Sequence, residues 1–256
     1  MPTRERTYRS EAIVLRRKNF GEADRLLTLL TPELGKVRVV AKGVRKLRSR
    51  KAGHLELFNC AKLLLARGRD LDIVTQAETV SAYRPLREDL LRGAYASYAV
   101  ELLDRFTPEA QENRELYALL RQALRWFAES PDLALTARYY ELHLLGLAGF
   151  QPQLRRCVVC GNTLVAEDQF FSPADGGAVC PSSADGRLGL VSISMGALKL
   201  LRYLQANPYV KVSALAVRPA AHAELERVLA RYITHLLERQ LKSTQFIKRL
   251  KQELPG

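Results

Sequence analysis

The chain has 256 residues, of which 47% are hydrophobic, so it is long enough for one large domain or two ordinary ones and is not a disordered chain. It carries 40 Lys and Arg against 27 Asp and Glu, a formal net charge of +13. Residues 1–70 hold 18 of the basic residues and only seven acidic ones, so the excess charge is local. Local positive charge indicates a surface that binds a polyanion, most commonly a nucleic acid. No apolar h-region follows Met1, and no apolar run approaches the ~20 residues of a membrane span, so we expect a soluble, cytoplasmic protein.

Short apolar or alternating segments fill the first eighty residues and predict a small β-barrel or sandwich. The second segment would also suit a helix, but the compact turn at residues 31–36 favours a strand that enters a hairpin. About five short strands separated by turn signals are most economically arranged as an OB-type barrel. The predicted strands lie within residues 10–17, 23–30, 37–42, 53–66 and 72–80.

The most basic stretch of the chain, residues 36–51, has eight Lys or Arg and no Asp or Glu. It begins as a half-buried strand and continues from Gly43 as a cationic loop or short helical turn. Because like charges repel, so many in one place favour a nucleic-acid backbone as partner; a solvated basic loop is the alternative. Phe20 lies in a turn and is expected to be exposed, whereas Phe58 is expected in the core. Scarce aromatics indicate phosphate contacts with little sequence specificity. The predicted phosphate contacts are Arg16, Arg17, Lys36, Arg38, Lys42, Arg45, Lys46, Arg48, Arg50 and Lys51.

The rest of the chain is mostly helical in pattern. Helix signals include Pro85, the residues 130–132 and Ser194, and His143 is expected to be a packed core or surface histidine rather than a ligand. Lys242, Lys248 and Arg249 form a second basic cluster, which either extends the nucleic-acid surface or is solvated. The predicted helices are residues 86–106, 116–127, 133–147, 195–205 and 222–240.

Cysteines in two groups indicate a metal site. Cys157 and Cys160 form a Cys-x-x-Cys pair, and Cys180 follows with Ser183 at the position of a fourth cysteine. Serine is a poor zinc ligand because its hydroxyl stays protonated near neutral pH. Three possibilities stay open: zinc held by three thiolates with water or Asp185, a zinc-free site that keeps the fold, which we favour, or an oxidisable thiol cluster.

Enzyme motifs are absent from the sequence: there is no P-loop, dinucleotide fingerprint, nucleophile elbow or His-Glu-x-x-His, and the four histidines are scattered. We therefore expect a non-enzymatic protein that binds no nucleotide cofactor, with zinc as a doubtful ligand.

Taken in order, the N-terminal motifs resemble the OB domain of the bacterial RecO family of recombination mediators. The resemblance covers the whole chain, more loosely in the C-terminal half. It implies a helical domain where protein partners dock, and a cysteine site that some members have lost. The motifs are Ala12–Leu15, Gly21–Arg25, Leu29–Thr31, Gly35-Lys36, Ala41–Arg45, Ser49-Arg50, Leu55–Phe58, Arg67–Arg69 and Ala77-Glu78.

We therefore predict an α+β fold, with an OB-type nucleic-acid-binding domain at residues 1–82 and a helical domain at residues 83–256. Residues 150–190 would form a degenerate zinc-ribbon-like insert within the helical domain. The resemblance implies a nucleoid-associated mediator of the RecF pathway that binds and anneals DNA. It would bind single- and double-stranded DNA and, with RecR, help load RecA onto gaps covered by single-strand-binding protein.

Two functions of other classes are alternatives. A metal at Cys157, Cys160 and Cys180 would allow a nuclease, and DNA cleavage abolished by Cys157→Ala would favour it. An RNA-binding barrel would be recognised by competition between RNA and DNA of equal length.

Overall fold

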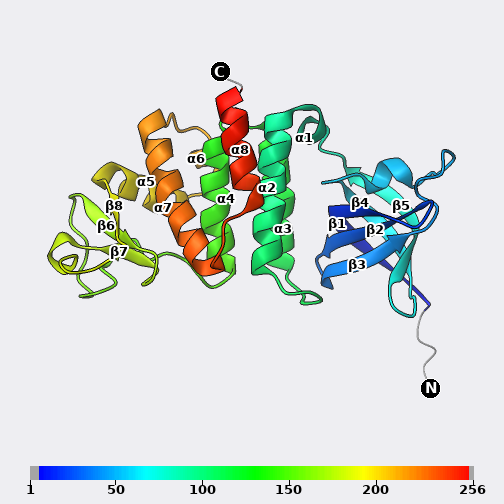
Figure 1. Ribbon diagram of the computed structural model, residues 1–256, viewed down its shortest axis with the longest axis horizontal. Coiled ribbons are helices and arrows are strands. Elements are labelled where there is room, and N and C mark those ends of the chain that lie inside the picture. Colours follow the sequence, from blue (N-terminus) through cyan, green and yellow to red (C-terminus); the bar gives the residue numbers. More distant parts are fainter. Residues whose placement is uncertain (1–5, 254–256) are drawn as a thin grey trace. The chain divides into compact units, whose positions relative to one another are not determined.

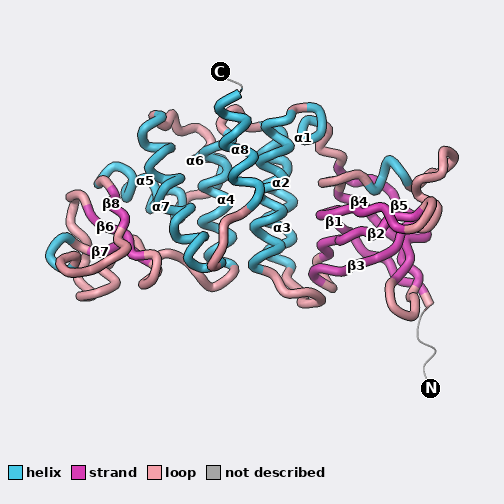
Figure 2. Tube along the Cα trace, viewed as in Figure 1, coloured by secondary structure: helices cyan, strands magenta, loops and turns pink. Residues whose placement is uncertain are grey.

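The computed structural model describes residues 6–253, and the chain forms two compact units, Met1–Glu129 and Ser130–Gly256. Figure 1 labels the helices and strands, and Figure 2 separates the strands of the barrel from the helices that follow. Among the described residues, no helix is both long and apolar enough to cross a membrane.

The N-terminal strands close into a five-stranded barrel in the order β1-β2-β3-β5-β4. All neighbouring strands are antiparallel except β3 and β5, which run parallel. This closed order is that of an OB-type barrel and confirms the predicted fold class. The strands are β1 (Thr7–Phe20), β2 (Asp24–Thr31), β3 (Gly35–Ala41), β4 (Cys60–Ala66) and β5 (Asp72–Ser81).

β1 closes the barrel because it pairs with both β2 and β4. Ile13 pairs with Leu30 of β2 and with Cys60 of β4, and the register shifts between Val14 and Arg16. Such a bulge bends a strand, which lets one long strand serve two neighbours. The barrel interior is filled by aliphatic side chains from all five strands, together with Val44 and Leu55 from the segment between β3 and β4.

The segment from His54 to Phe58 alternates in sequence but is not a strand, which corrects the prediction for residues 53–66. Residues Ala52–Leu55 form a short 3₁₀ helix, and β4 starts only at Cys60. Leu55 and Phe58 are both buried, so the apolar side chains satisfy the core without strand pairing. The expectation that Phe58 lies in the core is confirmed.

Three helices complete the first unit: α1 (Pro85–Glu88), α2 (Leu90–Phe106) and α3 (Arg114–Glu129). The sequence predicts one helix over residues 86–106, but the chain is extended at Asp89. The Asp89 carboxylate accepts a hydrogen bond of 2.9 Å from the Arg92 amide and so begins α2 as an N-cap. The preference of Asp for a capping position therefore interrupts an otherwise continuous apolar pattern.

Partly buried polar contacts join the barrel to these helices. The Glu11 carboxylate of β1 accepts hydrogen bonds from the Tyr117 hydroxyl at 2.7 Å and from the Arg121 guanidinium at 2.9 Å, both on α3. Gly35 lies so close to the α2–α3 connection that a Cβ there would be 1.9 Å from the Gln111 carbonyl oxygen. Glycine at position 35 is therefore required by close approach as well as by its φ of 61°.

The second unit consists of helices and a small three-stranded sheet of order β7-β6-β8. α4 occupies the predicted residues, with Asp132 as its N-cap, and Ser194 caps α5 as expected. α7 begins at Pro219 and ends before Glu238, which adopts a left-handed conformation. Its elements are α4 (Leu133–Leu147), β6 (Gln169–Ser172), β7 (Gly177–Val179), η2 (Pro181–Ser183), β8 (Val191–Ile193), α5 (Met195–Ala206), α6 (Tyr209–Val212), α7 (Pro219–Leu237) and α8 (Lys242–Glu253).

His143 of α4 is packed, as predicted. One ring nitrogen lies 3.1 Å from the Leu204 carbonyl oxygen, and burial lowers the pKa of the imidazole.

Candidate nucleic-acid interface and metal centre

The basic loop, residues 42–51, leaves the barrel after β3 and is anchored by one buried side chain. Val44 is 1% exposed and packs in the barrel core, while its neighbours face solvent. Hydrogen bonds from the Lys46 amide to the Gly43 carbonyl and from the Ser49 amide to the Lys46 carbonyl fold the loop into successive turns. The predicted change from strand to cationic loop is therefore confirmed.

The basic loop is tied to the turn between β1 and β2. The Gly43 amide donates to the Asp24 carboxylate at 2.7 Å, and the Arg45 amide donates to the Ala23 carbonyl at 2.9 Å. The Arg45 guanidinium also donates to the Glu22 carbonyl at 3.1 Å. The β1–β2 turn and the basic loop therefore form one continuous surface at the same end of the barrel.

Lys51 closes the base of the basic loop. Its ammonium donates to the Lys42 carbonyl at 3.2 Å and to the Val74 carbonyl of β5 at 2.8 Å. Burial lowers the pKa of Lys51, with the nearby Asp24 carboxylate acting in the opposite direction. This ammonium therefore holds the loop ends together, and its donors are directed at carbonyls rather than at solvent.

Four other predicted contacts form ion pairs outside the basic loop. Arg16 and Lys36 both bind Asp104 of α2, and the buried Lys36 ammonium also donates to two backbone carbonyls. Arg17 binds Glu56, and Arg38 lies 3.6 Å from Glu109. Of the four, only Lys36 is fully removed from solvent, and we leave it out of the proposed interface.

Those predicted phosphate contacts of the first unit that are exposed and form no ion pair all lie on the basic loop. Within residues 6–253, none of the five exposed loop cations forms an ion pair with a carboxylate. Unpaired positive charge on a hydrogen-bonded loop is suited to binding phosphates. These five are Lys42, Arg45, Lys46, Arg48 and Arg50.

Sequence reasoning missed two residues of this surface. Lys18 is exposed on β1, two residues before Phe20, so both side chains lie on the same face of the strand. Leu47 lies between Lys46 and Arg48 and is fully exposed. The signals were present, since Lys18 extends the Arg16-Arg17 run and Leu47 has no apolar neighbour within two residues.

The second basic cluster is on α8, in the second unit. Lys242, Lys248 and Arg249 are all exposed, while Ile247 and Leu250 are the buried residues of this helix. The basic loop and this cluster therefore belong to different units of the chain.

The fold brings together the three cysteines of the predicted metal site. The sulfurs of Cys157, Cys160 and Cys180 all lie within 4.8 Å of one another, and those of Cys160 and Cys180 are 3.7 Å apart. Ser183 lies on the turn after Cys180, with its hydroxyl 3.2 Å from the Cys180 sulfur. Among the described residues, Asp185 is not part of this ligand group.

The electrostatics of the cluster favour thiolates. Burial opposes ionisation of Cys157, but the backbone amides of Cys160, Cys180 and Val159 outweigh it and lower its pKa to about 6. Hydrogen bonds between its sulfur and the hydroxyls of Ser182 and Ser183 lower the pKa of Cys180. Because the thiolate is the metal-binding form of cysteine, the cluster can hold a metal ion such as zinc.

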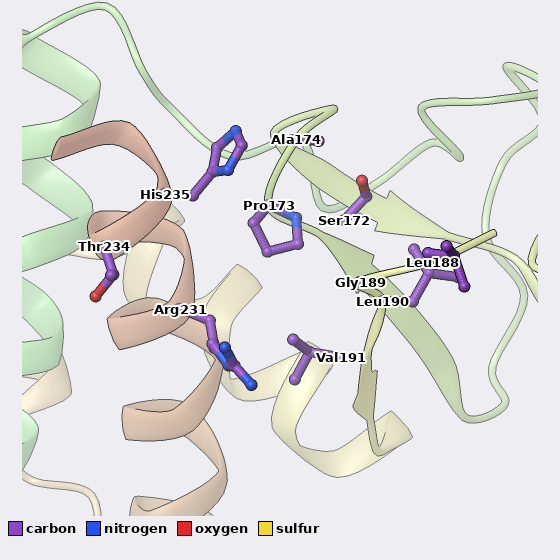
Figure 3. A pocket seen from close by; sticks show the side chains of 10 residues that line it. All are labelled: Ser172, Pro173, Ala174, Leu188, Gly189, Leu190, Val191, Arg231, Thr234 and His235. Atoms are coloured by element: carbon purple, nitrogen blue, oxygen red, sulfur yellow. The ribbon is translucent and has the colours of Figure 1, made fainter. Parts of the chain in front are cut away.

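Two pockets lie away from the basic loop. One of about 360 Å³ in the second unit is lined on one side by Arg231 and His235 of α7 and on the other by Pro173, Leu188 and Leu190 (Figure 3). The other, about 460 Å³ on the barrel, mixes basic and acidic side chains. Neither of these two pockets is lined by a residue of the basic loop.

Comparison with known proteins agrees with this architecture. Residues 5–83 match the family model "Recombination protein O N terminal", and residues 87–245 match "Recombination protein O C terminal". Three proteins named DNA repair protein RecO are similar over nearly the whole chain. The protein of Roseiflexus sp. strain RS-1 is 47% identical over 98% of this chain and 88% of its own length. That of Symbiobacterium thermophilum is 39% identical over 95% and 98%, and that of Dehalococcoides mccartyi strain 195 is 36% identical over 97% and 98%.

Matches to both family models and to full-length relatives well above 30% identity are sufficient to assign the family. The chain belongs to the RecO family of DNA repair proteins.

Proposed function

We propose that this chain binds and anneals DNA strands at gaps and, together with RecR, helps load RecA onto DNA covered by single-strand-binding protein. Its family consists of non-enzymatic recombination mediators, which leaves the nuclease and RNA-binding alternatives without specific support. The observation that carries the proposal is the set of five exposed cations on a loop fixed to the barrel by hydrogen bonds.

The proposed mechanism is electrostatic. Each loop cation that neutralises a phosphate releases a condensed counterion, so binding is favourable, sensitive to salt and tolerant of sequence. Contacts to phosphates leave the Watson–Crick edges of the bases free, which permits pairing with a second strand. RecR and single-strand-binding protein are proposed as partners on the basis of the family assignment.

The basic loop can be tested by replacing Arg45, Lys46 and Arg48 with Ala. Each lost phosphate contact reduces the log–log salt slope for a single strand by about 0.7, so the triple variant should lose about 2 from a slope near 3.5. Fluorescence anisotropy across a salt series measures the affinity of each protein for a short single-stranded DNA, and the salt slopes of the wild type and the variant follow from it.

The matched control removes the same charge elsewhere: K199A/K211A/R239A changes three exposed cations of the second unit. The control should keep the wild-type slope. A triple loop variant that binds DNA like the wild type would show that the interface is wrongly assigned.

We also propose that Cys157, Cys160 and Cys180 hold a structural zinc ion. Three thiolates match the ligand preference of zinc, and the ion would crosslink the segments that precede β6 and follow β7. Metal analysis of the purified protein should find about one zinc per chain, and Cys157→Ser should abolish it. A full-length, folded wild-type protein without zinc under metal-replete conditions would contradict the proposal.

A further inference from the structure

We propose that Phe20 and Leu47 contact the bases of a single DNA strand, so that the basic surface selects strands whose bases are unpaired. The inference rests on the proposed DNA binding at the basic loop and adds a base-contacting part to it. It assigns a ligand preference that phosphate contacts alone would not give, because phosphates are present in both single and double strands.

Two large apolar side chains are exposed on this surface. Phe20 is 51% exposed and Leu47 is fully exposed. Single exposed apolar residues are common on proteins, so exposure alone does not identify a contact. A second, independent observation is that Phe20 and Leu47 lie on two elements that hydrogen bonds join to each other.

Hydrogen bonds connect the two elements that carry these residues. Phe20 is the last residue of β1 and pairs with Asp24 across the β1–β2 turn. The Asp24 carboxylate accepts the amide of Gly43, and the Ala23 carbonyl accepts the amide of Arg45, which is two residues before Leu47. The ring and the leucine therefore belong to one preformed surface.

Exposed cations lie next to both apolar residues along the chain. Lys18 lies on the same strand face as Phe20, and Lys46 and Arg48 flank Leu47 in the chain. A strand whose phosphates bind these cations brings its bases to the same surface. Charge complementarity therefore favours a nucleic acid, rather than an apolar protein segment, as the ligand that covers Phe20 and Leu47.

Base faces are apolar and accessible only in an unpaired strand. They stack on aromatic rings, and aliphatic side chains insert between neighbouring bases as wedges. In a duplex the same faces are stacked on one another, and separating them is unfavourable. The surface therefore favours single strands and strand junctions over intact duplex.

The test compares two single strands with the same number of phosphates: an oligothymidylate of 20 nucleotides and an abasic strand of equal length. The wild type should bind the oligothymidylate about tenfold more tightly, since each base that stacks on the protein adds favourable contact. The F20A/L47A variant should bind both strands alike, with an unchanged salt slope. Phe20→Trp should keep the preference, and its fluorescence should be quenched by the oligothymidylate but not by a duplex.

L188A is the matched control, because Leu188 is an equally exposed leucine of the second unit and should leave the preference unchanged. A preference retained by F20A/L47A would overturn the inference. Equal binding of both strands by the wild type, with a normal salt slope, would overturn the inference alone. Failure to bind either strand would overturn the proposed DNA binding and this inference with it.

Discussion

The ammonium of Lys36 lies at the C-terminal end of α2 rather than at a DNA surface. It donates to the Asp104 carboxylate at 2.8 Å and to the carbonyls of Asp104 and Thr107 at 3.1 and 3.0 Å. A cation here complements the partial negative charge of the last helical carbonyls. The basic residues that follow Lys36 in the sequence predict a phosphate contact there. Its actual partners, Asp104 and Thr107, lie about seventy residues away in the sequence and could not be recognised from it.

Lys36→Met should destabilise the first unit without changing the DNA surface. Without the buried ammonium, Asp104 keeps only its pair with Arg16, and the Asp104 and Thr107 carbonyls lose a donor, which should lower the free energy of unfolding by about 2 kcal/mol. Urea denaturation measures this loss. Arg38→Met, which removes the exposed pair with Glu109, should cost less than about 1 kcal/mol. A stable Lys36→Met variant with weakened DNA binding would return Lys36 to the interface.

At the scale of elements, the turn after Cys180 has the residue spacing of a zinc knuckle but only one thiol. Ser183 is correctly spaced and its hydroxyl is 3.2 Å from the Cys180 sulfur. Ser183→Cys would supply a fourth thiolate and should raise zinc affinity by more than about tenfold, since even hydrogen-bond partners of zinc ligands change affinity by that factor. Competition with a chromophoric chelator measures it. Ser213→Cys, which adds an exposed thiol elsewhere, should leave the affinity unchanged.

Elements with strong local signals could be predicted from the sequence. The caps Asp132 and Ser194 fix the starts of α4 and α5, and turn residues separate most strands of the barrel. The strands β6, β7 and β8 have only three or four residues, too few for a periodicity to be recognised. Charge located the basic loop, but the sequence did not distinguish Arg16 and Arg17, which bind Asp104 and Glu56, from the unpaired loop cations.

At the scale of the whole molecule, the first compact unit extends beyond the barrel to Glu129. The domain boundary expected at residue 82 remains a prediction, and the two family models also change near it. The contacts of Glu11 with Tyr117 and Arg121, however, belong to a unit that continues to Glu129. The barrel therefore depends on α3 to satisfy a half-buried carboxylate.

A fragment of residues 1–129 should unfold cooperatively and keep the salt-dependent DNA binding of the full chain. A fragment of residues 1–83 should be less stable, because Glu11 loses its partners and apolar residues of the outer barrel surface are uncovered. Thermal unfolding followed by circular dichroism compares the two. Equal melting temperatures would show that the barrel folds independently of its helices.

The double pairing of β1 also has a consequence for the order of events during synthesis. Once residue 41 has left the ribosome, β1, β2 and β3 are available to form a meander, but β1 still lacks its second neighbour. That neighbour, β4, starts at Cys60, and β5 must then fit between it and β3. Until Ser81 has emerged, the nascent sheet has two open edges, which are the parts of a β-sheet most prone to pair with another chain.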